Sequence, residues 1–567
     1  MQKFTMCESC QDEYMNPSNR RYHAQPISCN SCGPVLSKTI ESIAKDIKSG
    51  KIVAIKGIGG FHIVCDSRNN EAVKKLREFK NRPTKPFALM CKDLEQVQTL
   101  ADVSEKEGEV LESCEAPIVI LKKSSTKVIP EFIAPNIDRI GCFLPYTALH
   151  HLLFKYLDNP IVATSANLNN EPIIIDAKEI QKKLPFVDSI LDFDRDILNG
   201  VDDSLVQIVG SKIQTLRLSR GYAPKVIKLP FKSQKKILAV GANAKNSIAF
   251  VIDDNIILSP HIGDLDSLEA FKFFTKTIET FKSFYNFEPD LIVHDKHPNY
   301  ETSKWAKQQG KELIDVQHHL AHIYACKAEF GLSRDYLGFS FDGTGFGYDG
   351  TLWGGEVFVG DKRKYSFKQI KLLGADKAIK EPRRVALSMI FDKYALEEIM
   401  SLDLKLVKSF KDSEIKILHQ SHSQNLNAPL SSSVGRVFDA MASFSNLLQF
   451  QSYEGEAGLV CEQNYNKDIT RTFEYRIIDG VIDIDFDFFD KDIVSVFINT
   501  LVEIVLDISK IEKLDVILSG GVFQNKTLLE LIIQEFEKEE ITYFHQQETA
   551  INDGGIALGQ AYYNIYN

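Results

Sequence analysis

The chain has 567 residues, more than a single hydrophobic core normally holds, so we expect about three to four domains. Its formal net charge of -10 argues against general binding to the backbone of nucleic acids. The sequence has neither an apolar signal core at its start nor an apolar run of about eighteen residues, so we expect a cytoplasmic protein without a membrane partner.

Four cysteines near the start form two Cys-x2-Cys pairs, Cys7 with Cys10 and Cys29 with Cys32, and 18 residues separate the pairs. Paired thiolates at this separation are typical of a four-cysteine structural zinc site. Bound zinc would supply the folding energy that about forty residues cannot obtain from a hydrophobic core. Two disulfides are the alternative, and they conflict with a cytoplasmic location. We therefore predict a zinc module over residues 1–38.

Helices and apolar strands alternate from residue 39 to residue 228, which predicts an α/β domain, called here the middle domain. The clearest elements are a helix at residues 40–47, a strand at 51–55, a turn at 57–61, a helix at 71–80 and a strand at 161–163. Ser165 and Asn167 add short polar groups in the loop that follows the last of these strands.

Several cations of the middle domain lie at strand ends or in loops, beside glycine, proline or serine, where cations can converge on a triphosphate. They are Lys56, Arg82, Lys85, Arg217 and Arg220. Taken singly, each is better explained as a solvated surface cation. Taken together, they predict one clamp around a nucleotide.

Residues 225–236 contain five lysines and a proline with little periodicity, so we predict a linker there. A C-terminal domain over residues 235–567 follows. Its first predicted elements are strands at 237–240, 247–252, 256–259 and 291–293, a hairpin turn at 253–255 and a helix at 268–284. The apolar spacing of that helix indicates core packing rather than a cofactor site.

His318 and His322 lie four residues apart inside a helical pattern, so both imidazoles project from one face, as two nitrogen ligands of a divalent metal would. Polar surface or a satisfied core is the alternative reading of such a pair. Asp342 and Asp553 each offer a carboxylate beside a glycine-rich turn. Two histidines with one or two aspartates form a catalytic metal set with open positions, which favours the metal interpretation.

Two strands of the C-terminal domain, at residues 336–341 and 515–518, lead directly into glycine-rich loops. The loops are Asp342-Gly343-Thr344-Gly345 and Ser519-Gly520-Gly521. Such loops let backbone N–H groups approach phosphates, although each alone is also an ordinary tight turn and neither matches a Walker or dinucleotide motif. Two such units predict a duplicated nucleotide-binding fold with the ligand between its lobes.

Longer motifs extend these observations over the whole chain. They include Arg20-Arg21-Tyr22-His23-Ala24-Gln25-Pro26, Lys56-Gly57-x-Gly59-Gly60-Phe61-His62, Arg82-Pro83-x-Lys85-Pro86-Phe87-Ala88, Thr164-Ser165-Ala166-Asn167, Ser219-Arg220-Gly221-Tyr222-Ala223-Pro224, His297-Pro298-x-Tyr300, Trp353-Gly354-Gly355-Glu356, Tyr453-Glu454-Gly455-Glu456-Ala457-Gly458 and Asn552-Asp553-Gly554-Gly555. With these motifs the chain resembles the HypF family, the carbamoyltransferases of nickel–iron hydrogenase maturation. The resemblance implies a multidomain α/β protein with a four-cysteine zinc module, a YrdC-like α/β domain and a TsaD-like duplicated domain of the actin and Hsp70 ATPase-like fold.

The sequence departs from the family pattern in two places. The pattern usually begins with an acylphosphatase-like domain, which releases carbamate from carbamoyl phosphate, and a first zinc module, and this sequence contains neither. A fragment, a separate partner and a truncated gene model are the explanations left open. Leu320 stands where the family more often has a third consecutive histidine. Because Leu320 lies between the ligand pair, we expect the metal site to survive this change.

The resemblance implies that the middle domain joins ATP, bound as its magnesium complex, and carbamate into carbamoyl-adenylate. Lys56, Lys85 and Arg220 would then act on the phosphates that leave, while Ser165 and Asn167 would fix the nucleotide. In the C-terminal domain, His318, His322, Asp342 and Asp553 would hold iron or zinc, because the ligand set suits either metal.

The adenylate-binding residues implied for the C-terminal domain are Gly343, Thr344, Gly345, Gly520, Gly521 and Asn525, with Glu356, Gly435 and Asp439 as weaker candidates for the adenosine part. The acceptor would be the C-terminal cysteine of the partner HypE. A small-molecule O-carbamoyltransferase and a tRNA threonylcarbamoyl-adenosine enzyme are alternatives, and a zinc-organised ATP-binding scaffold is the non-enzymatic one. In the first of these the TsaD-like part precedes the YrdC-like part and a zinc module is absent, unlike here.

Overall fold

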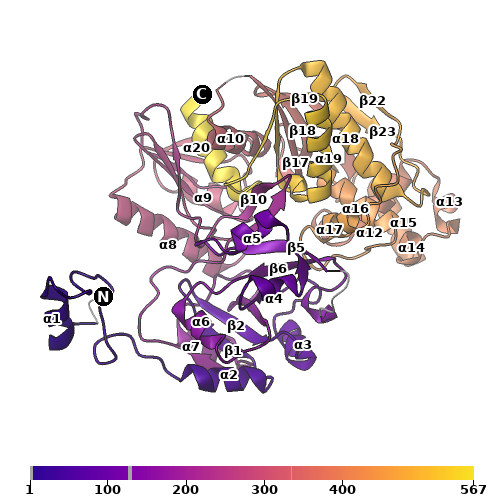
Figure 1. Cartoon of the computed structure of the whole chain (residues 1–567). Helices are drawn as coiled ribbons and strands as arrows, with labels where there is room; N and C mark the ends of the chain where they lie inside the picture. Colours follow the sequence, from indigo (N-terminus) through magenta and orange to yellow (C-terminus); the bar gives the residue numbers. More distant parts are fainter. Residues whose placement is uncertain (1–3, 125–129, 334, 567) are drawn as a thin grey trace.

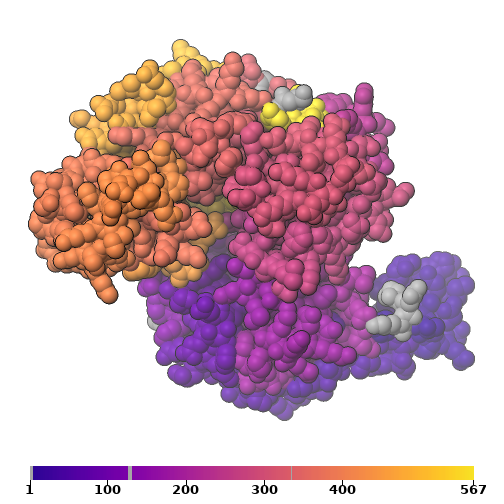
Figure 2. Space-filling model, turned by 180° about the vertical axis from the view of Figure 1, so that it is seen from behind, coloured from indigo at the N-terminus to yellow at the C-terminus, as the bar shows by residue number. Residues whose placement is uncertain are grey.

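The computed structural model describes residues 4–124, 130–333 and 335–566. The zinc module projects to one side of the body, and the C-terminal domain lies against the middle domain (Figure 1). The space-filling view from behind shows the same arrangement, with the C-terminal domain above the middle domain and the zinc module at the edge (Figure 2). No helix among the described residues combines the length and apolarity that crossing a membrane requires.

The zinc module has one helix, α1 (Glu8–Met15), which begins directly after Cys7. It buries little apolar surface, since Cys10 and Ile27 are its buried hydrophobic residues among those described. The module joins the body through its last residues, where the Val35 backbone N–H donates to the Asp194 carboxylate over 2.8 Å. A short bridge between Leu36 and Phe193 continues this junction.

A ten-stranded mixed sheet forms the centre of the middle domain, in the order β10-β9-β5-β6-β3-β7-β2-β1-β8, with β4 paired to β5. Its strands are β1 (Val53–Lys56), β2 (Phe61–Asp66), β3 (Ala88–Met90), β4 (Ala101–Asp102), β5 (Ile118–Lys123), β6 (Arg139–Phe143), β7 (Ile161–Ser165), β8 (Ser189–Leu191), β9 (Leu205–Val209) and β10 (Lys212–Arg217). The helices are α2 (Ile40–Lys48), α3 (Asn70–Phe79), α4 (Leu94–Gln98), α5 (Glu105–Leu111), α6 (Ala148–Leu153) and α7 (Ala177–Lys183), with the short η1 (Glu131–Ile133).

Apolar side chains on both faces explain why helices cover this sheet on both sides. In β1, Val53 and Ile55 pack with α2 and α6, whereas Ala54 packs on the opposite face with α3 and α7. The alternation follows from the two-residue period of a strand. The predicted helices at 40–47 and 71–80 are therefore confirmed as α2 and α3.

The first lobe of the C-terminal domain is a six-stranded sheet in the order β11-β14-β13-β12-β15-β16. Its elements are β11 (Lys225–Lys228), β12 (Ile237–Ala239), β13 (Ala249–Ile252), β14 (Asn255–Leu258), β15 (Leu291–Asp295), β16 (Glu312–Val316), α8 (Leu268–Tyr285) and α9 (Glu301–Lys307). The linker predicted at 225–236 is wrong at its start, because β11 pairs antiparallel with β14. The lysines of β11 lie on an edge strand, where charge is compatible with pairing.

The second lobe contains a nine-stranded sheet whose main path is β22-β23-β19-β18-β17-β24-β25. Its strands are β17 (Tyr336–Phe346), β18 (Leu352–Val359), β19 (Lys362–Phe367), β20 (Ile370–Lys371), β21 (Leu430–Ser431), β22 (Tyr475–Ile478), β23 (Val481–Ile484), β24 (Asp515–Ser519) and β25 (Tyr543–His545). Its helical elements are α11 (Asp376–Lys380), α12 (Pro382–Phe391), α13 (Leu396–Ser401), α14 (Lys405–Lys408), α15 (Asp412–Ser423), α16 (Val434–Phe444), α17 (Glu456–Gln463), α18 (Ile493–Glu512), α19 (Lys526–Lys538), η2 (Gly521–Gln524) and η3 (Asp553–Gly555).

Two helices, α10 (His318–Phe330) and α20 (Ile556–Tyr566), lie between these sheets. Their side chains share one hydrophobic core with β12 and β15 of the first lobe and with Ile517 of the second. Eleven residues of α10 are buried, so this helix has no solvent-facing stripe. The histidines therefore belong to the centre of the domain rather than to a polar surface.

Candidate functional site

The four cysteines of the zinc module come together as predicted. The sulfur atoms of Cys7 and Cys29 are 3.7 Å apart, those of Cys29 and Cys32 are 3.8 Å apart, and those of Cys32 and Cys10 are 3.6 Å apart. Sulfurs bound tetrahedrally to zinc at about 2.3 Å would be about 3.8 Å apart. Backbone N–H groups of Ser31 and Cys32 lower the pKa of the Cys29 thiol to about 6, which favours the thiolate that binds metal.

The histidine pair lies in the first turns of α10. Gln317 caps this helix, and its side-chain oxygen accepts hydrogen bonds from the N–H groups of His319 and Leu320. The cap fixes where the helix begins, so His318 and His322 are one turn apart on the same face. His319 points elsewhere, with its Nδ1 3.0 Å from the Gln317 amide nitrogen.

Asp342 and Asp553 face this pair from the second lobe and from the start of α20. Asp342 lies where the ladder between β17 and β18 loses its register, just after Phe341, and this irregularity frees its carboxylate from the regular sheet. Asp553 lies in η3, one residue after Asn552, which caps the turn by accepting from the Gly554 N–H.

The four side chains surround one point. The His318 Nε2 atom is 3.5 Å from Asp342 Oδ2 and 3.7 Å from Asp553 Oδ1, and the His322 Nε2 atom is 3.7 Å and 3.6 Å from the same two atoms. Nitrogen and oxygen ligands at about 2.1 Å from a metal would be about 3.4 Å apart in a tetrahedral site. The Nε2 atoms are buried and lack a hydrogen-bond partner among the described residues.

Electrostatics at this point also suit a cation. Burial lowers the pKa of His318, but Asp295, Asp342 and Asp553 more than offset it, so the pKa lies well above its ordinary value. Burial raises the pKa of Asp342, but the two imidazoles outweigh burial and hold it well below the usual range. Two buried carboxylates thus attract positive charge, and a divalent metal would supply that charge in place of protons. The donor set and its spacing therefore fit a metal.

Asp295, at the end of β15, is a site residue that the sequence reasoning missed. Its Oδ2 lies 2.7 Å from His318 Nδ1, and both side chains are almost completely buried. A carboxylate on one ring nitrogen orients the other nitrogen toward a metal. The signal available in the sequence was its position at a strand end, two residues before His297-Pro298.

Glycines let the backbone close around Asp342. A Cβ at Gly345 would lie 2.6 Å from the His319 ring, and a Cβ at Gly521 would lie 2.8 Å from the Asp342 carboxylate. Gly520 has a φ of +103° and its Cβ would meet the Phe341 carbonyl at 2.3 Å. The predicted loops Gly343–Gly345 and Gly520–Gly521 thus meet at the aspartate, and Gly435 lies against Gly343. Thr344 lies between Gly343 and Gly345 in β17.

The remaining nucleotide candidates differ in how many of their polar atoms already bond to other protein groups. Glu356 accepts from the N–H groups of Gly354 and Gly355, from Ser432 and from Arg363. Burial raises the pKa of Asp439 to about 7, opposed by Arg436 at 3.1 Å. Asn525 caps α19 through its side-chain oxygen, while its buried amide nitrogen has no partner among the described residues. Asp439 and Asn525 therefore retain polar atoms for a ligand, and the role predicted for Glu356 stays a prediction.

A second cluster, of cations, lies in the middle domain. Burial, together with the nearby guanidinium groups of Arg82 and Arg217, lowers the pKa of Lys85 to about 8. Burial and Arg82 lower the pKa of Lys80 to about 7. The Lys85 side chain is exposed to solvent, yet both domains act on it, since Asp264 and Glu454 of the C-terminal domain raise the pKa of the same ammonium. An anion bound among these cations would relieve their mutual repulsion and favour their charged forms.

Lys80 connects this cluster to the predicted nucleotide loop and was not recognised in the sequence. Its ammonium donates to the Ser165 carbonyl over 2.9 Å and to the Asn167 side-chain oxygen over 2.9 Å. Ser165 also donates to Asn167 over 3.0 Å. A lysine after a helix is usually a solvated cation, and only its position two residues before Arg82-Pro83 distinguished it.

Lys56 and Arg220 are bonded within the middle domain instead of joining this cluster directly. Lys56 donates to the Phe193 carbonyl over 2.8 Å and lies 2.9 Å from the Asp192 carboxylate. Arg220 pairs with Asp203 over 2.6 Å and donates to two further backbone carbonyls. Their predicted catalytic roles remain predictions.

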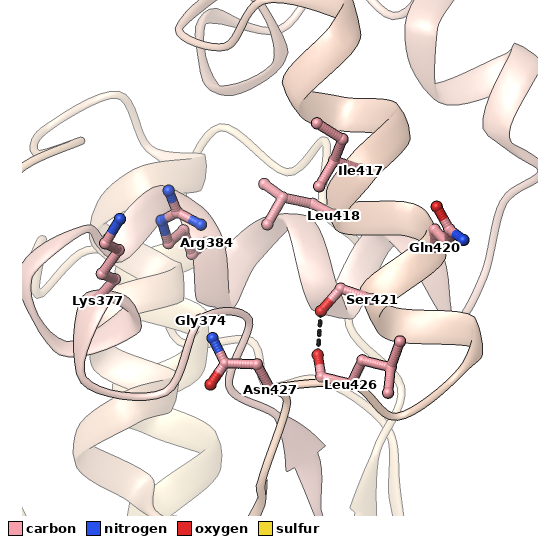
Figure 3. Close-up of a pocket in the computed structure, with 9 residues that line it drawn as sticks. All are labelled: Gly374, Lys377, Arg384, Ile417, Leu418, Gln420, Ser421, Leu426 and Asn427. Carbon is pink, nitrogen blue, oxygen red and sulfur yellow. Dashed lines mark hydrogen bonds between the residues drawn. The ribbon is translucent and has the colours of Figure 1, made fainter.

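A surface pocket of about 450 Å³ lies in the helical part of the second lobe (Figure 3). Its lining residues are Gly374, Lys377, Arg384, Ile417, Leu418, Gln420, Ser421, Leu426 and Asn427. None of them is a predicted site residue, and Arg384 is already paired with Glu381. The two side-chain clusters, rather than this pocket, are therefore the candidate sites.

Family models match in four segments. The HypF finger model matches residues 6–38, and the Sua5, YciO and YrdC model, described as telomere recombination, matches residues 45–219. The HypF Kae1-like domain model matches residues 232–329, and the second subdomain of the carbamoyltransferase Kae1-like domain matches residues 338–560. The α/β architecture and zinc module expected from the sequence are thereby confirmed.

The chain is 37% identical over 567 residues to carbamoyltransferase HypF of Synechocystis sp., covering 94% of this chain and 74% of that protein. It is 33% identical over 598 residues to carbamoyltransferase HypF of Rhodobacter capsulatus, covering 99% and 79%. A crystal structure of full-length HypF in a phosphate- and nucleotide-bound form superposes with a TM-score of 0.94 at 37% identity, covering 99% of this chain and 78% of that one. The chain therefore belongs to the HypF carbamoyltransferase family.

Proposed function

We propose that this chain makes carbamoyl-adenylate in its middle domain and transfers the carbamoyl group in its C-terminal domain to the C-terminal cysteine of HypE. In the first step a carbamate oxygen attacks the α-phosphorus of ATP and pyrophosphate leaves. In the second, the cysteine thiolate attacks the carbamoyl carbon and AMP leaves. The observation that carries the proposal is the presence of two separate clusters, one cationic and one of histidines and aspartates, within a single chain of this family.

In the adenylation step, Lys80, Arg82, Lys85 and Arg217 hold the β- and γ-phosphates, which gain charge as pyrophosphate leaves. Lys80 also keeps Ser165 and Asn167 in place beside the nucleotide. Two roles are open to Lys56 and Arg220. Each either leaves its protein partner to bind a phosphate, or stays bonded and holds the loops that carry the other cations.

In the transfer step, His318, His322, Asp342 and Asp553 would hold iron or zinc, with Asp295 orienting His318. A metal bound there supplies Lewis acidity and an anchor for the adenylate. The loops at Gly343–Gly345 and Gly520–Gly521 approach the phosphate, and Asp439 and Asn525 take the adenosine side.

Carbamate decomposes in water, so an enclosed route between the two sites suits this chemistry. The two domains act on one another electrostatically: burial lowers the pKa of His261 in the C-terminal domain, and Arg217 and Lys85 of the middle domain add to this effect with Lys245. Carbamate reaches the chain either directly or from carbamoyl phosphate, and comparing the two as substrates with ATP and HypE distinguishes these sources. The order of the two domains favours this function over a small-molecule O-carbamoyltransferase.

The variant His318→Ala tests the division of labour. It should abolish carbamoyl transfer to HypE and leave carbamate-dependent release of pyrophosphate unchanged, because the two steps use different residues. Pyrophosphate release and the mass of the HypE tail are measured on the same preparation. Loss of both activities in a folded variant would contradict the assignment.

A further inference from the structure

A short segment of the C-terminal domain, residues 451–456, contacts the middle domain and also both lobes of its own domain. It contains most of the Tyr453–Gly458 motif, to which neither reaction step above gives a role. We call it the junction loop. Its last residue, Glu456, begins α17, and Gly455 before it has a φ of +79°, which allows the chain to turn directly into that helix.

The junction loop is bonded to the middle domain at Thr84. The Thr84 hydroxyl donates to Glu456 Oε1 over 2.6 Å and also contacts the Ser452 hydroxyl. Glu456 is 5% exposed, and its other carboxylate oxygen accepts from the Ser452 N–H over 2.5 Å. Thr84 is therefore held by a buried carboxyl group that belongs to the other domain.

The same loop is anchored on its other sides within the C-terminal domain. Glu454 pairs with Lys245 of the first lobe over 2.7 Å. The Gln451 N–H donates to the Lys380 carbonyl of the second lobe over 3.0 Å. The junction loop thus has fixed points on both lobes, and Thr84 is tied to a rigid partner.

Thr84 lies in the middle of residues 82–86, which we call the cation loop because they include Arg82 and Lys85. Arg77 holds this loop from the middle-domain side, donating to the Arg82 carbonyl over 2.7 Å and to the Lys85 carbonyl over 3.1 Å. Arg82 and Arg217 add to burial in lowering the pKa of Lys85, so like charges oppose one another at the cation loop when no anion is bound. The contacts of Thr84 with Glu456 and Ser452 give the cation loop a second fixed point, on the other domain.

We propose that Glu456, a residue of the C-terminal domain, is a positioning residue for adenylation in the middle domain, acting through Thr84 on the cation loop. The proposal rests on the adenylation step proposed above. It makes the geometry of the phosphate site depend on docking of the two domains, so that adenylate forms efficiently only where the transfer domain is ready to receive it. A hydrogen bond to a buried carboxylate has the strength that such positioning requires.

A double-mutant cycle tests this inference in the full chain. Thr84→Val and Glu456→Ala should each lower kcat/KM for ATP in carbamate-dependent ATP–pyrophosphate exchange about tenfold, mainly through KM. The double variant should be no worse than either single one, since both remove the same contact. Thr84→Ser, which keeps the hydroxyl, should restore the wild-type value.

The matched control is Gln463→Ala on α17, which removes a 2.9 Å hydrogen bond to the Asp138 N–H in the same interface without touching the cation loop. It should leave exchange unchanged. Melting temperature and metal content are measured for every variant, to exclude unfolding as the cause. Additive losses in the double variant, or exchange retained by Thr84→Val and Glu456→Ala, would overturn the inference. A wild-type chain without carbamate-dependent exchange would instead overturn the proposed function, and the inference with it.

Discussion

Two lysines of the cation cluster titrate near neutral pH. Burial and neighbouring guanidinium groups lower the pKa of Lys85 to about 8, and burial with Arg82 lowers the pKa of Lys80 to about 7. Both groups bind phosphate only as ammonium ions. A bound triphosphate favours that form, so nucleotide binding raises both pKa values and is linked to proton uptake.

The sign of this linkage gives a pH prediction. ATP affinity should be highest below about pH 7 and should fall as pH rises through the range of 7 to 8, where free Lys80 and Lys85 lose their protons. Calorimetry of ATP binding in buffers of different ionisation enthalpy should show proton uptake near pH 8. The γ-phosphate changes charge over part of this range, so Lys85→Arg is the control, and it should take up fewer protons. Equal uptake by both proteins would refute the assignment to Lys85.

Residue-level prediction from sequence worked where the chemistry and the local pattern agreed. His318 and His322 share a helix face, and Asp342 and Asp553 adjoin glycine turns, so their types and spacing predicted a cluster that the structure brings together. Lys80 and Asp295 escaped notice because their roles depend on partners that are 85 and 23 residues away. No local pattern records such contacts.

At the scale of elements, the crossing of α10 and α20 is the feature on which the metal cluster depends. Gly559 lies where α20 touches α10, and a Cβ there would lie 1.7 Å from the Ala321 carbonyl oxygen. Ala321 directly precedes His322, so any displacement at this crossing reaches the ligand. Helical periodicity predicted a helix around the histidines, whereas this close contact follows from packing of two lobes. The strand β11 was missed for a similar reason, since it is defined by pairing with β14, which comes later in the chain at Asn255–Leu258.

We expect Gly559→Ala to push α20 away from α10. Overpacking of this kind costs about 1–3 kcal/mol of stability, and the movement should weaken metal binding at His318 and His322. Denaturant unfolding measures the first effect and titration with zinc or iron(II) the second. The control is Gly458→Ala in α17, where a Cβ would meet nothing within 4 Å and better helix propensity should leave stability equal or slightly higher. Unchanged unfolding of Gly559→Ala would show that the helices can separate freely.

At the scale of the whole molecule, the parts differ in how closely they are joined. The hairpin of β9 and β10 packs its glutamines on the C-terminal domain, where Gln207 and Gln214 donate to the carbonyls of Gln524 and Phe523. Cysteine spacing and the alternation of helices and strands led us to expect three units, but not this interface, because polar pairs between two domains produce no periodic sequence pattern. The zinc module, in contrast, extends from the body and joins it through a few contacts near Val35 (Figure 1).

This separation predicts that zinc binding in the N-terminal module and the thermal stability of the rest of the chain are independent. Cys29→Ser should lose the structural zinc and loosen residues up to about 33, because the module has almost no hydrophobic core to replace the metal. The main calorimetric unfolding transition should remain, since the body shares little packing with the module. Zinc content by metal analysis and limited proteolysis measure the first effect, and Cys114→Ser, at an exposed cysteine outside the cluster, is the matched control. If Cys29→Ser kept its zinc, or if its main unfolding transition moved to a lower temperature, the module would be held by contacts beyond its four thiolates.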